Sequence, residues 1–224
     1  MPIITISREL GAGGTFIALK LAEAIGGTCI EKEIIHEIAQ KMGKSREDIT
    51  DFDQDSYNRI GVFFQEALSS IAKGGRVFHP FGMGPLDWES TNFIPSFPEQ
   101  DFKHDEYIDV LTQVIKDLAA KGNVVILGRG ASRILHDHTD ALHVRIVADI
   151  KDRVARIMDE QKVDEAKARD LIDRRDSSAS SFLSDFFDAD WNDPLLYHIT
   201  VNTSWIAPEA AVSLILAALK RPAA

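Results

Sequence analysis

The segment ITISRELGAGGT, residues 4–15, combines residue types that could bind a phosphate group. Its small residues, GAGG, stand between a strand-like apolar run and a helical pattern, TFIALKLAEAI. In the motif G-x-x-x-x-G-K-[ST], backbone N–H groups between a strand and a helix surround phosphate oxygens. Aligned with that motif, Gly13 is the second glycine and Thr15 is the hydroxyl residue that binds magnesium. Arg8 stands in place of the first glycine, and Gly14 stands in place of the lysine.

The loop therefore lacks its usual positive charge. A lysine would reach the β- and γ-phosphates, and Gly14 cannot do so. Arg8 lies at the other end of the loop, and its side chain is long enough to fold back across it. We predict that Arg8 supplies the missing charge and that Thr15 still ligates magnesium. Two alternatives stay open: the glycines serve only close helix packing, or Arg8 pairs with Glu9 or another carboxylate and points away from the phosphate.

A second basic position follows the apolar run NVVIL, which ends in Gly128, Arg129 and Gly130. Ligands of doubly wound sheets bind beyond the carboxyl ends of the strands. We therefore expect Arg129 to face the same crevice as the glycine loop, poised for a phosphate. The alternative is an arginine in a turn that forms a surface salt bridge.

Charged residues alternate in the stretch DEAKARDLIDRRD, which predicts a helix that begins near residue 164. Oppositely charged side chains stand four residues apart there: Arg169 with Asp173, and Asp170 with Arg174, followed by Arg175. This pattern is typical of a solvated helix with salt bridges. A mobile arm that carries arginines over a transferring phosphoryl group would need the same composition.

Short apolar runs alternate with helical patterns along the chain, which indicates an α/β protein with a largely parallel sheet. The predicted strands are residues 3–6, 28–30, 124–127, 142–147 and 199–202. A helix over 16–25 would bury Ile17, Leu21 and Ala24 on one face, and further helices are expected around 110–118 and over 208–219. The sheet would therefore be covered by helices.

The composition of the 224 residues indicates one domain, with residues 50–105 as an appended flap or insert. The net charge of −10 argues against a nucleic-acid partner. We expect no membrane span and a cytoplasmic protein, since the N-terminus has no secretion pattern. Residues 74–102 hold prolines and irregularly spaced aromatics. They predict an irregular cover that packs on the core or on a partner subunit, as in a homodimer, although a substrate loop stays open.

Five separated segments together resemble the cytidylate kinase-like family: ITISRELGAGG, GRGA, HVRIVADIKDRVARIM, ARDLIDRRD and DWNDPLLYHITVNTS. They follow the family's order and cover nearly the whole chain except residues 50–102. Members of this family are relatives of bacterial cytidylate kinase whose loop reads S-R-x-x-G-S-G-G. The resemblance implies a three-layer P-loop kinase fold, α/β, with a central parallel sheet, helices on both faces, a monophosphate-binding flap and an arginine-bearing lid at residues 160–190.

The resemblance also implies roles for individual residues. The loop would bind the nucleotide through Ser7, Arg8, Gly11, Ala12, Gly13, Gly14 and Thr15, and the lid region would carry Arg169, Arg174, Arg175 and Asp176. Arg129 would hold the acceptor phosphate. The catalytic group would then be Arg8, Arg129, Arg174 and Arg175, with Arg169 binding the nucleotide. Asp190, Trp191, Asn192 and Asp193 are expected to form a structural turn before the last strand.

Two departures from the family pattern bear on the reaction. Cytidylate kinase proper has an aspartate after the arginine at 129, where this chain has Gly130. The closer relatives continue the lid with basic residues, where this chain has Ser177 and Ser178. The leading hypothesis is an ATP-dependent phosphotransferase that uses Mg²⁺ and acts on a nucleoside monophosphate such as CMP. The alternative is a nucleotide-binding or sensing protein with the same fold and little turnover.

Overall fold

The computed structural model describes residues 1–31, 34, 38, 41 and 104–219. The segment predicted as an irregular cover, 74–102, lies outside the described residues, as does almost all of the flap predicted at 50–105.

The described part of the chain forms one parallel sheet of five strands in the order β2-β3-β1-β4-β5. The strands are β1 (Ile3–Arg8), β2 (Thr28–Ile30), β3 (Val124–Leu127), β4 (Ala141–Val147) and β5 (Ile199–Asn202). Three of them have the predicted bounds. β1 runs two residues further than predicted, because Ser7 and Arg8 pair with Arg145 and Ile146 of β4. Arg8 is therefore the last residue of the central strand.

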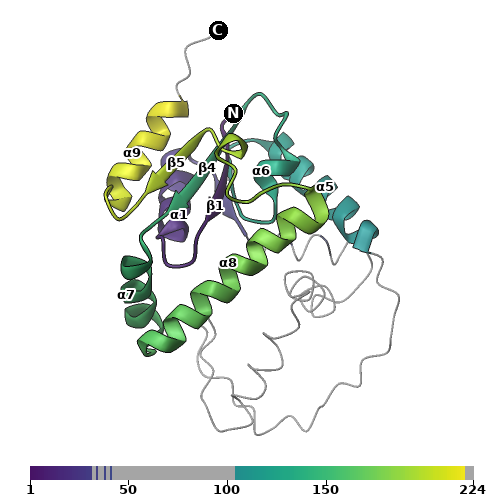
Figure 1. Ribbon diagram of the computed structural model, residues 1–224. Helices are drawn as coiled ribbons and strands as arrows, with labels where there is room; N and C mark the ends of the chain where they lie inside the picture. Colours follow the sequence, from purple (N-terminus) through teal and green to yellow (C-terminus); the bar gives the residue numbers. More distant parts are fainter. Residues whose placement is uncertain (32–33, 35–37, 39–40, 42–103, 220–224) are drawn as a thin grey trace, which may run out of the picture.

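Helices cover both faces of the sheet (Figure 1). One face carries α1 (Gly14–Ala24) and α9 (Pro208–Leu219), and the other carries α5 (His104–Lys121) and the short α6 (Ala131–Ile134). Two more helices, α7 (Ile150–Gln161) and α8 (Glu165–Phe187), follow β4. Figure 1 shows α8 as a long helix that crosses below the carboxyl ends of the strands. A 3-10 turn, η2 (Pro194–Leu196), precedes β5.

The core consists of two apolar layers, one on each face of the sheet. Alternate residues of β1 serve the two layers, since Ile3 belongs to the layer under α5, whereas Ile4 and Ile6 belong to the layer under α1 and α9. This period of two follows from the pleat of a strand. β3 (VVIL) is buried at every position because both faces are covered.

The buried face of α1 differs from the prediction at one position. Ile17 and Leu21 are buried as expected, but Ala24 is exposed, and Ala18 and Ala22 are buried instead. Ala24 comes three residues after Leu21 and Ala22 comes directly after it, so the two lie on opposite sides of Leu21 around the helix. The helix is rotated so that the edge beside Ala18 and Ala22 meets the sheet.

The parallel sheet with helices on both faces is a three-layer α/β fold, as predicted. In a sheet of this kind the loops that follow the strands meet at the carboxyl edge. Here the loops after β1, β2 and β3 carry the candidate site.

Candidate phosphate-binding site

The loop from Glu9 to Gly13 joins β1 to α1 and takes a tight, glycine-dependent path. Gly11 and Gly13 have φ angles of 79° and 78°, in the left-handed region that favours glycine. A Cβ atom at Gly11 would lie 2.9 Å from the carbonyl oxygen of Arg153. Position 11 therefore requires glycine for two reasons, the backbone angle and the close approach of α7.

Three carbonyl groups in the middle of this loop are bound by side chains of the protein. Arg153 Nε donates to Leu10 O (2.8 Å), Arg156 Nη1 to Gly11 O (3.0 Å) and Thr203 Oγ1 to Ala12 O (2.8 Å). Gly13 caps α1 without a side-chain hydrogen bond. The first N–H groups of a helix have no partner within it. The amides at the start of α1 are therefore the groups through which this loop could bind an anion.

Arg8 crosses the carboxyl edge of the sheet between two glycines. A Cβ atom at Gly14 would lie 2.5 Å from Arg8 Cβ and 2.7 Å from Arg8 Cγ, and one at Gly128 would lie 2.7 Å from Arg8 Nη1. The guanidinium then forms an ion pair with Glu31, the residue that follows β2. The carboxylate partner of Arg8 is therefore Glu31 and not Glu9.

Arg129 lies in the same place, at the carboxyl end of β3. Its backbone is left-handed (φ 58°), between Gly128 and Gly130, and its side chain is half-buried. The pKa of Arg129 is lowered to about 9, first by burial and then by the charges of Arg175 and Arg8, whereas the charge of Glu31 raises it. Residues at the carboxyl ends of three strands and a residue of α8 therefore converge here. We call Arg8, Arg129, Arg175 and Glu31 the arginine cluster.

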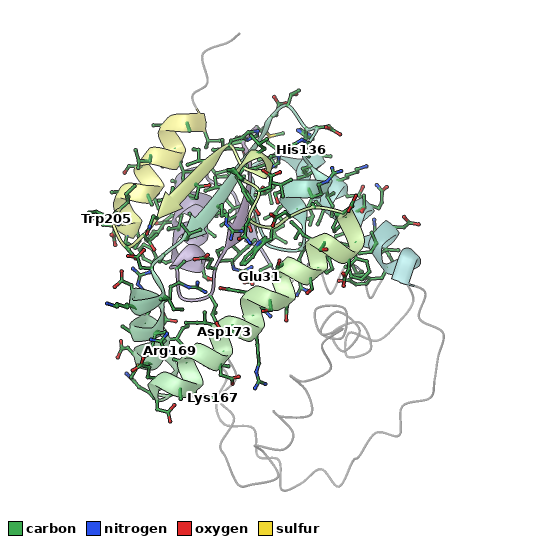
Figure 2. All side chains as sticks on the ribbon, viewed as in Figure 1. Glu31, His136, Lys167, Arg169, Asp173 and Trp205 are labelled. Atoms are coloured by element: carbon green, nitrogen blue, oxygen red, sulfur yellow. The ribbon has the colours of Figure 1, made fainter. Side chains whose placement is uncertain are left out.

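Among the described residues, the arginine cluster brings three guanidinium groups together with one carboxylate. Arginine side chains stay protonated at neutral pH. A bound anion would reduce the repulsion between such like charges. Figure 2 shows Glu31 in front of the middle of α8, below the strands.

The other predicted lid arginines are placed differently. Arg169 donates to Glu165 Oε1 through Nε (3.0 Å) and Nη2 (2.8 Å), and it is exposed. Arg174 Nε donates to Asp170 Oδ1 (2.7 Å). Figure 2 shows Arg169 near the end of α8 that packs on α7, away from Glu31. The predicted pair of Arg169 with Asp173 is thus replaced by a pair one turn earlier.

Ser7 is held by the turn that precedes β5. Its Oγ accepts hydrogen bonds from Trp191 Nε1 (2.8 Å) and Tyr197 OH (3.3 Å). Within this turn Asp190 and Asp193 accept from backbone N–H groups two residues later, as a structural turn requires. The arrangement gives the Ser7 hydroxyl an anchoring role between strand and turn.

Thr15 is the second residue of α1 and is exposed. Mg²⁺ in phosphate sites usually keeps several waters and binds one or two protein oxygens together with phosphate oxygens. The described residues contain no group of three or more His, Cys, Asp or Glu side chains that could hold a metal ion. A hydroxyl at the start of α1 would lie beside phosphates held by the helix amides, which fits that chemistry.

Several residues of the site have no role in the sequence prediction. They are Glu31, Arg153, Arg156, Thr203 and Arg145, whose Nη2 lies 3.7 Å from Glu9 Oε1. Glu31 could have been found by the rule that identified Arg129, since it follows a strand directly. The arginines of α7 carry no comparable signal, because DRVAR also suits an exposed helix face.

Comparison with known proteins gives the family. The family model of the cytidylate kinase-like family matches residues 3–205, and the chain belongs to that family. It is 23% identical over 207 residues to a cytidylate kinase from Thermoplasma acidophilum, which covers 92% of this chain and 85% of the relative. A cytidylate kinase from Sulfolobus acidocaldarius is 26% identical over 124 residues, 55% of this chain and 66% of the relative.

Among solved structures, an uncharacterized protein from Eubacterium ventriosum has the same fold, with a TM-score of 0.66 and 20% identity. The match covers 99% of this chain and all of that one. A kinase-type function follows from the family. None of the helices in the described part of the chain is long and apolar enough to span a bilayer.

Proposed function

We propose that this chain is an ATP-dependent phosphotransferase that transfers a phosphoryl group to a nucleoside monophosphate such as CMP. The observation that carries the proposal is the arginine cluster, which lies next to the uncapped start of α1. An anion site made of helix amides and a second one made of arginines would suit two phosphate groups that react with each other. The two curated relatives named above are cytidylate kinases, which supports this substrate class.

Phosphoryl transfer requires mainly positioning and positive charge from the protein. The amides that begin α1, with Arg8 beside them, would bind the donor phosphates. Arg129 would hold the acceptor phosphate. Arg174 and Arg175 of α8 would stabilise charge that develops during transfer. Bound Mg²⁺ supplies charge neutralisation on the donor phosphates, and Thr15 is the residue that would ligate it.

Position 130 does not contribute a side chain that could recognise the base of the acceptor nucleotide. A Cβ atom at Gly130 would lie 2.9 Å from Cε2 of Phe187, and Gly130 has a φ angle of 66°. The end of α8 thus occupies the space that a side chain there would need. Cytosine selectivity, if present, must come from other groups.

The Arg8–Glu31 ion pair favours one alternative, a nucleotide-binding or sensing protein with little turnover. The pair engages the guanidinium of Arg8, which is the group predicted to replace the charge of the missing lysine. A charge held by a carboxylate contributes less to the transition state than one directed at phosphate.

One experiment separates the two functions. Purified protein is incubated with ATP, Mg²⁺ and each of CMP, UMP, AMP, GMP and dCMP, and the diphosphates are quantified by chromatography. Thermal unfolding is recorded with the same ligands. We expect CDP formation and an increase in melting temperature with ATP. Binding without any diphosphate would favour the sensing function, and a melting temperature that no nucleotide changes would contradict both.

A further inference from the structure

A buried ionic network lies beneath the glycine loop and joins it to α7 and α8. Arg153, which is 6% exposed, contacts three partners: Leu10 O through Nε, Glu9 Oε2 at 3.3 Å through Nη1, and the Asp176 carboxylate through Nη2. Asp176 Oδ1 also accepts from the backbone N–H of Leu10 at 3.0 Å. Both polar backbone groups of Leu10 are therefore bound, the carbonyl by α7 and the amide by α8.

Asp176 makes the polar contact between α8 and the loop. The N-terminal half of α8 packs on α7 in a small apolar cluster of Val154, Ile157, Ala168 and Ile172, against which Leu10 also packs. The C-terminal half joins the main core through Phe182 and Leu183. Between these two contacts lie Arg175, whose charge acts on Arg129, and Asp176. Figure 1 shows α8 as one continuous helix over this whole distance.

Adjacent positions on a helix are separated by about 100° of rotation, because a turn contains 3.6 residues. When Asp176 is fixed on Leu10, the side of α8 from which the Arg175 side chain leaves is fixed as well. This arrangement differs from an arm that swings freely. Any displacement of α8 from the arginine cluster must break the hydrogen bond to Leu10 or carry the loop with it.

We propose that Asp176 is a positioning residue that couples the conformation of the phosphate loop to the placement of Arg175. The functional consequence of this coupling rests on the proposed function, whereas the coupling itself concerns two described parts of the protein. In the ligand-free protein Asp176 holds the loop in its anion-binding form. When an anion binds between the loop and the arginine cluster, the same contact keeps Arg175 next to it.

The first test measures the coupling without any activity. Asp176→Asn keeps an oxygen that can accept from Leu10 N–H but removes the charge that pairs with Arg153. Asp173→Asn is the matched control, since Asp173 is exposed on the same helix and the variant makes the same change in net charge (Figure 2). Amide hydrogen exchange is followed by mass spectrometry in the full-length, ligand-free protein, with peptides that cover residues 9–16 and the strands β3 and β4.

We expect exchange in residues 9–16 to rise about 10- to 100-fold in Asp176→Asn, as the loss of a charge-assisted contact predicts. In Asp176→Asn, the exchange rates in β3 and β4 should match those of the parent. In Asp173→Asn, the exchange rates of all these peptides should match those of the parent. Unchanged loop exchange would overturn the proposal. A rise of equal size in the loop and the strands would do so too, because it would show general destabilisation.

The second test measures the effect on Arg175 with inorganic tripolyphosphate as the probe. Dissociation constants are obtained by calorimetry for the parent, Asp176→Asn, Arg175→Ala and the double variant. If Asp176 acts through Arg175, the tripolyphosphate affinity falls about tenfold in Asp176→Asn but changes much less when Arg175 is already absent. Fully additive effects would contradict the coupling. If the parent binds no tripolyphosphate, the proposed function fails, and the exchange data still decide on the positioning role.

Discussion

Arg8 fills the space into which a side chain at Gly14 would project. A Cβ atom on Gly14 would lie 2.5 Å from the Cβ of Arg8, well inside van der Waals contact. Residues 8 and 14 are therefore a matched pair, with a long side chain on one side of the loop and none on the other. Arg8 and a lysine at position 14 could not coexist in this backbone.

This relationship predicts strong coupling between the two positions. Gly14→Ala should lower the free energy of unfolding by about 1–3 kcal/mol, the usual cost of overpacking. In an Arg8→Gly background the same change should cost at least about 1 kcal/mol less, because the clashing atoms are gone. Urea unfolding of the four proteins gives the coupling energy, and additive effects would show that the loop moves to admit the methyl group.

Arg8 and Glu31 should affect triphosphate binding in opposite directions. Arg8→Ala should weaken ATP–Mg²⁺ binding by about 1.5–3 kcal/mol, the range for hydrogen bonds to a charged group. Glu31→Gln removes the carboxylate that competes with phosphate for the arginine cluster, and it should bind ATP–Mg²⁺ at least as tightly as the parent. Calorimetry at constant ionic strength measures both. If Arg8→Ala binds as the parent does, the loop holds phosphate through its amides alone.

The arginines of α8 should act on turnover more than on ground-state binding. Arg174→Ala and Arg175→Ala should each reduce kcat by about 10²-fold or more, with a smaller effect on ATP affinity, since they would contact charge that develops in the transition state. Lys20→Gln removes an exposed positive charge on α1 and serves as the control. Steady-state rates and ATP titrations on the same preparations test this, and an unchanged rate would assign these arginines to surface salt bridges.

Trp205 should bind the base of the donor nucleotide. It is 84% exposed and lies two residues after Thr203, which donates to Ala12 O of the loop. Figure 2 shows Trp205 beside α9, at the edge of the molecule. Because stacking on an aromatic ring contributes about 1–3 kcal/mol per base, Trp205→Ala should weaken ATP binding by that amount. Tripolyphosphate, which has no base, should bind both proteins equally, and Leu214→Ala is an exposed apolar control.

Equal losses for ATP and tripolyphosphate would contradict a stacking role for Trp205. They would instead show that the segment from Thr203 to Trp205 supports the phosphate loop.

His143 should make the protein sensitive to acid. It is fully buried, its Nδ1 accepts from Thr5 Oγ1 (2.8 Å), and its Nε2 donates to Leu135 O (3.1 Å). Burial, and then the nearby charge of His198, lower the pKa of His143 from 6.5 to about 4. Between these values the unfolded chain binds the proton and the folded one does not. Stability should therefore fall as the pH drops below 6.5, by up to about 3 kcal/mol at pH 4.

His143→Asn should be less stable than the parent at pH 7 and should lose less stability between pH 6.5 and 4. Urea unfolding at several pH values measures the slope. His136→Asn changes an exposed histidine and should keep the slope of the parent. A parent slope that is unaffected by His143→Asn would assign the acid sensitivity to other groups.

The local pattern of apolar and charged residues in the sequence is sufficient to predict most of the fold. The five strands and the parallel sheet follow from short apolar runs, since covered strands need apolar residues on both faces. The helix after residue 164 was found from its charges, and Asp164 caps it by accepting from Lys167 N (2.8 Å). The position of Arg129 at the carboxyl edge followed from the strand before it, because topology brings all strand ends to one edge.

The partners of the charged residues were decided only by the tertiary structure. The sequence leaves Arg8 open between a phosphate and a carboxylate, and the strand order places Glu31, 23 residues away, beside it. Leu10 and Asp176 are 166 residues apart in sequence, and Gly11 and Arg156 are 145 apart. An arginine on a helix has the same local pattern whether it faces water or a loop carbonyl. The difference arises when α7 and α8 cross the end of the sheet, and that crossing is a property of the packed chain.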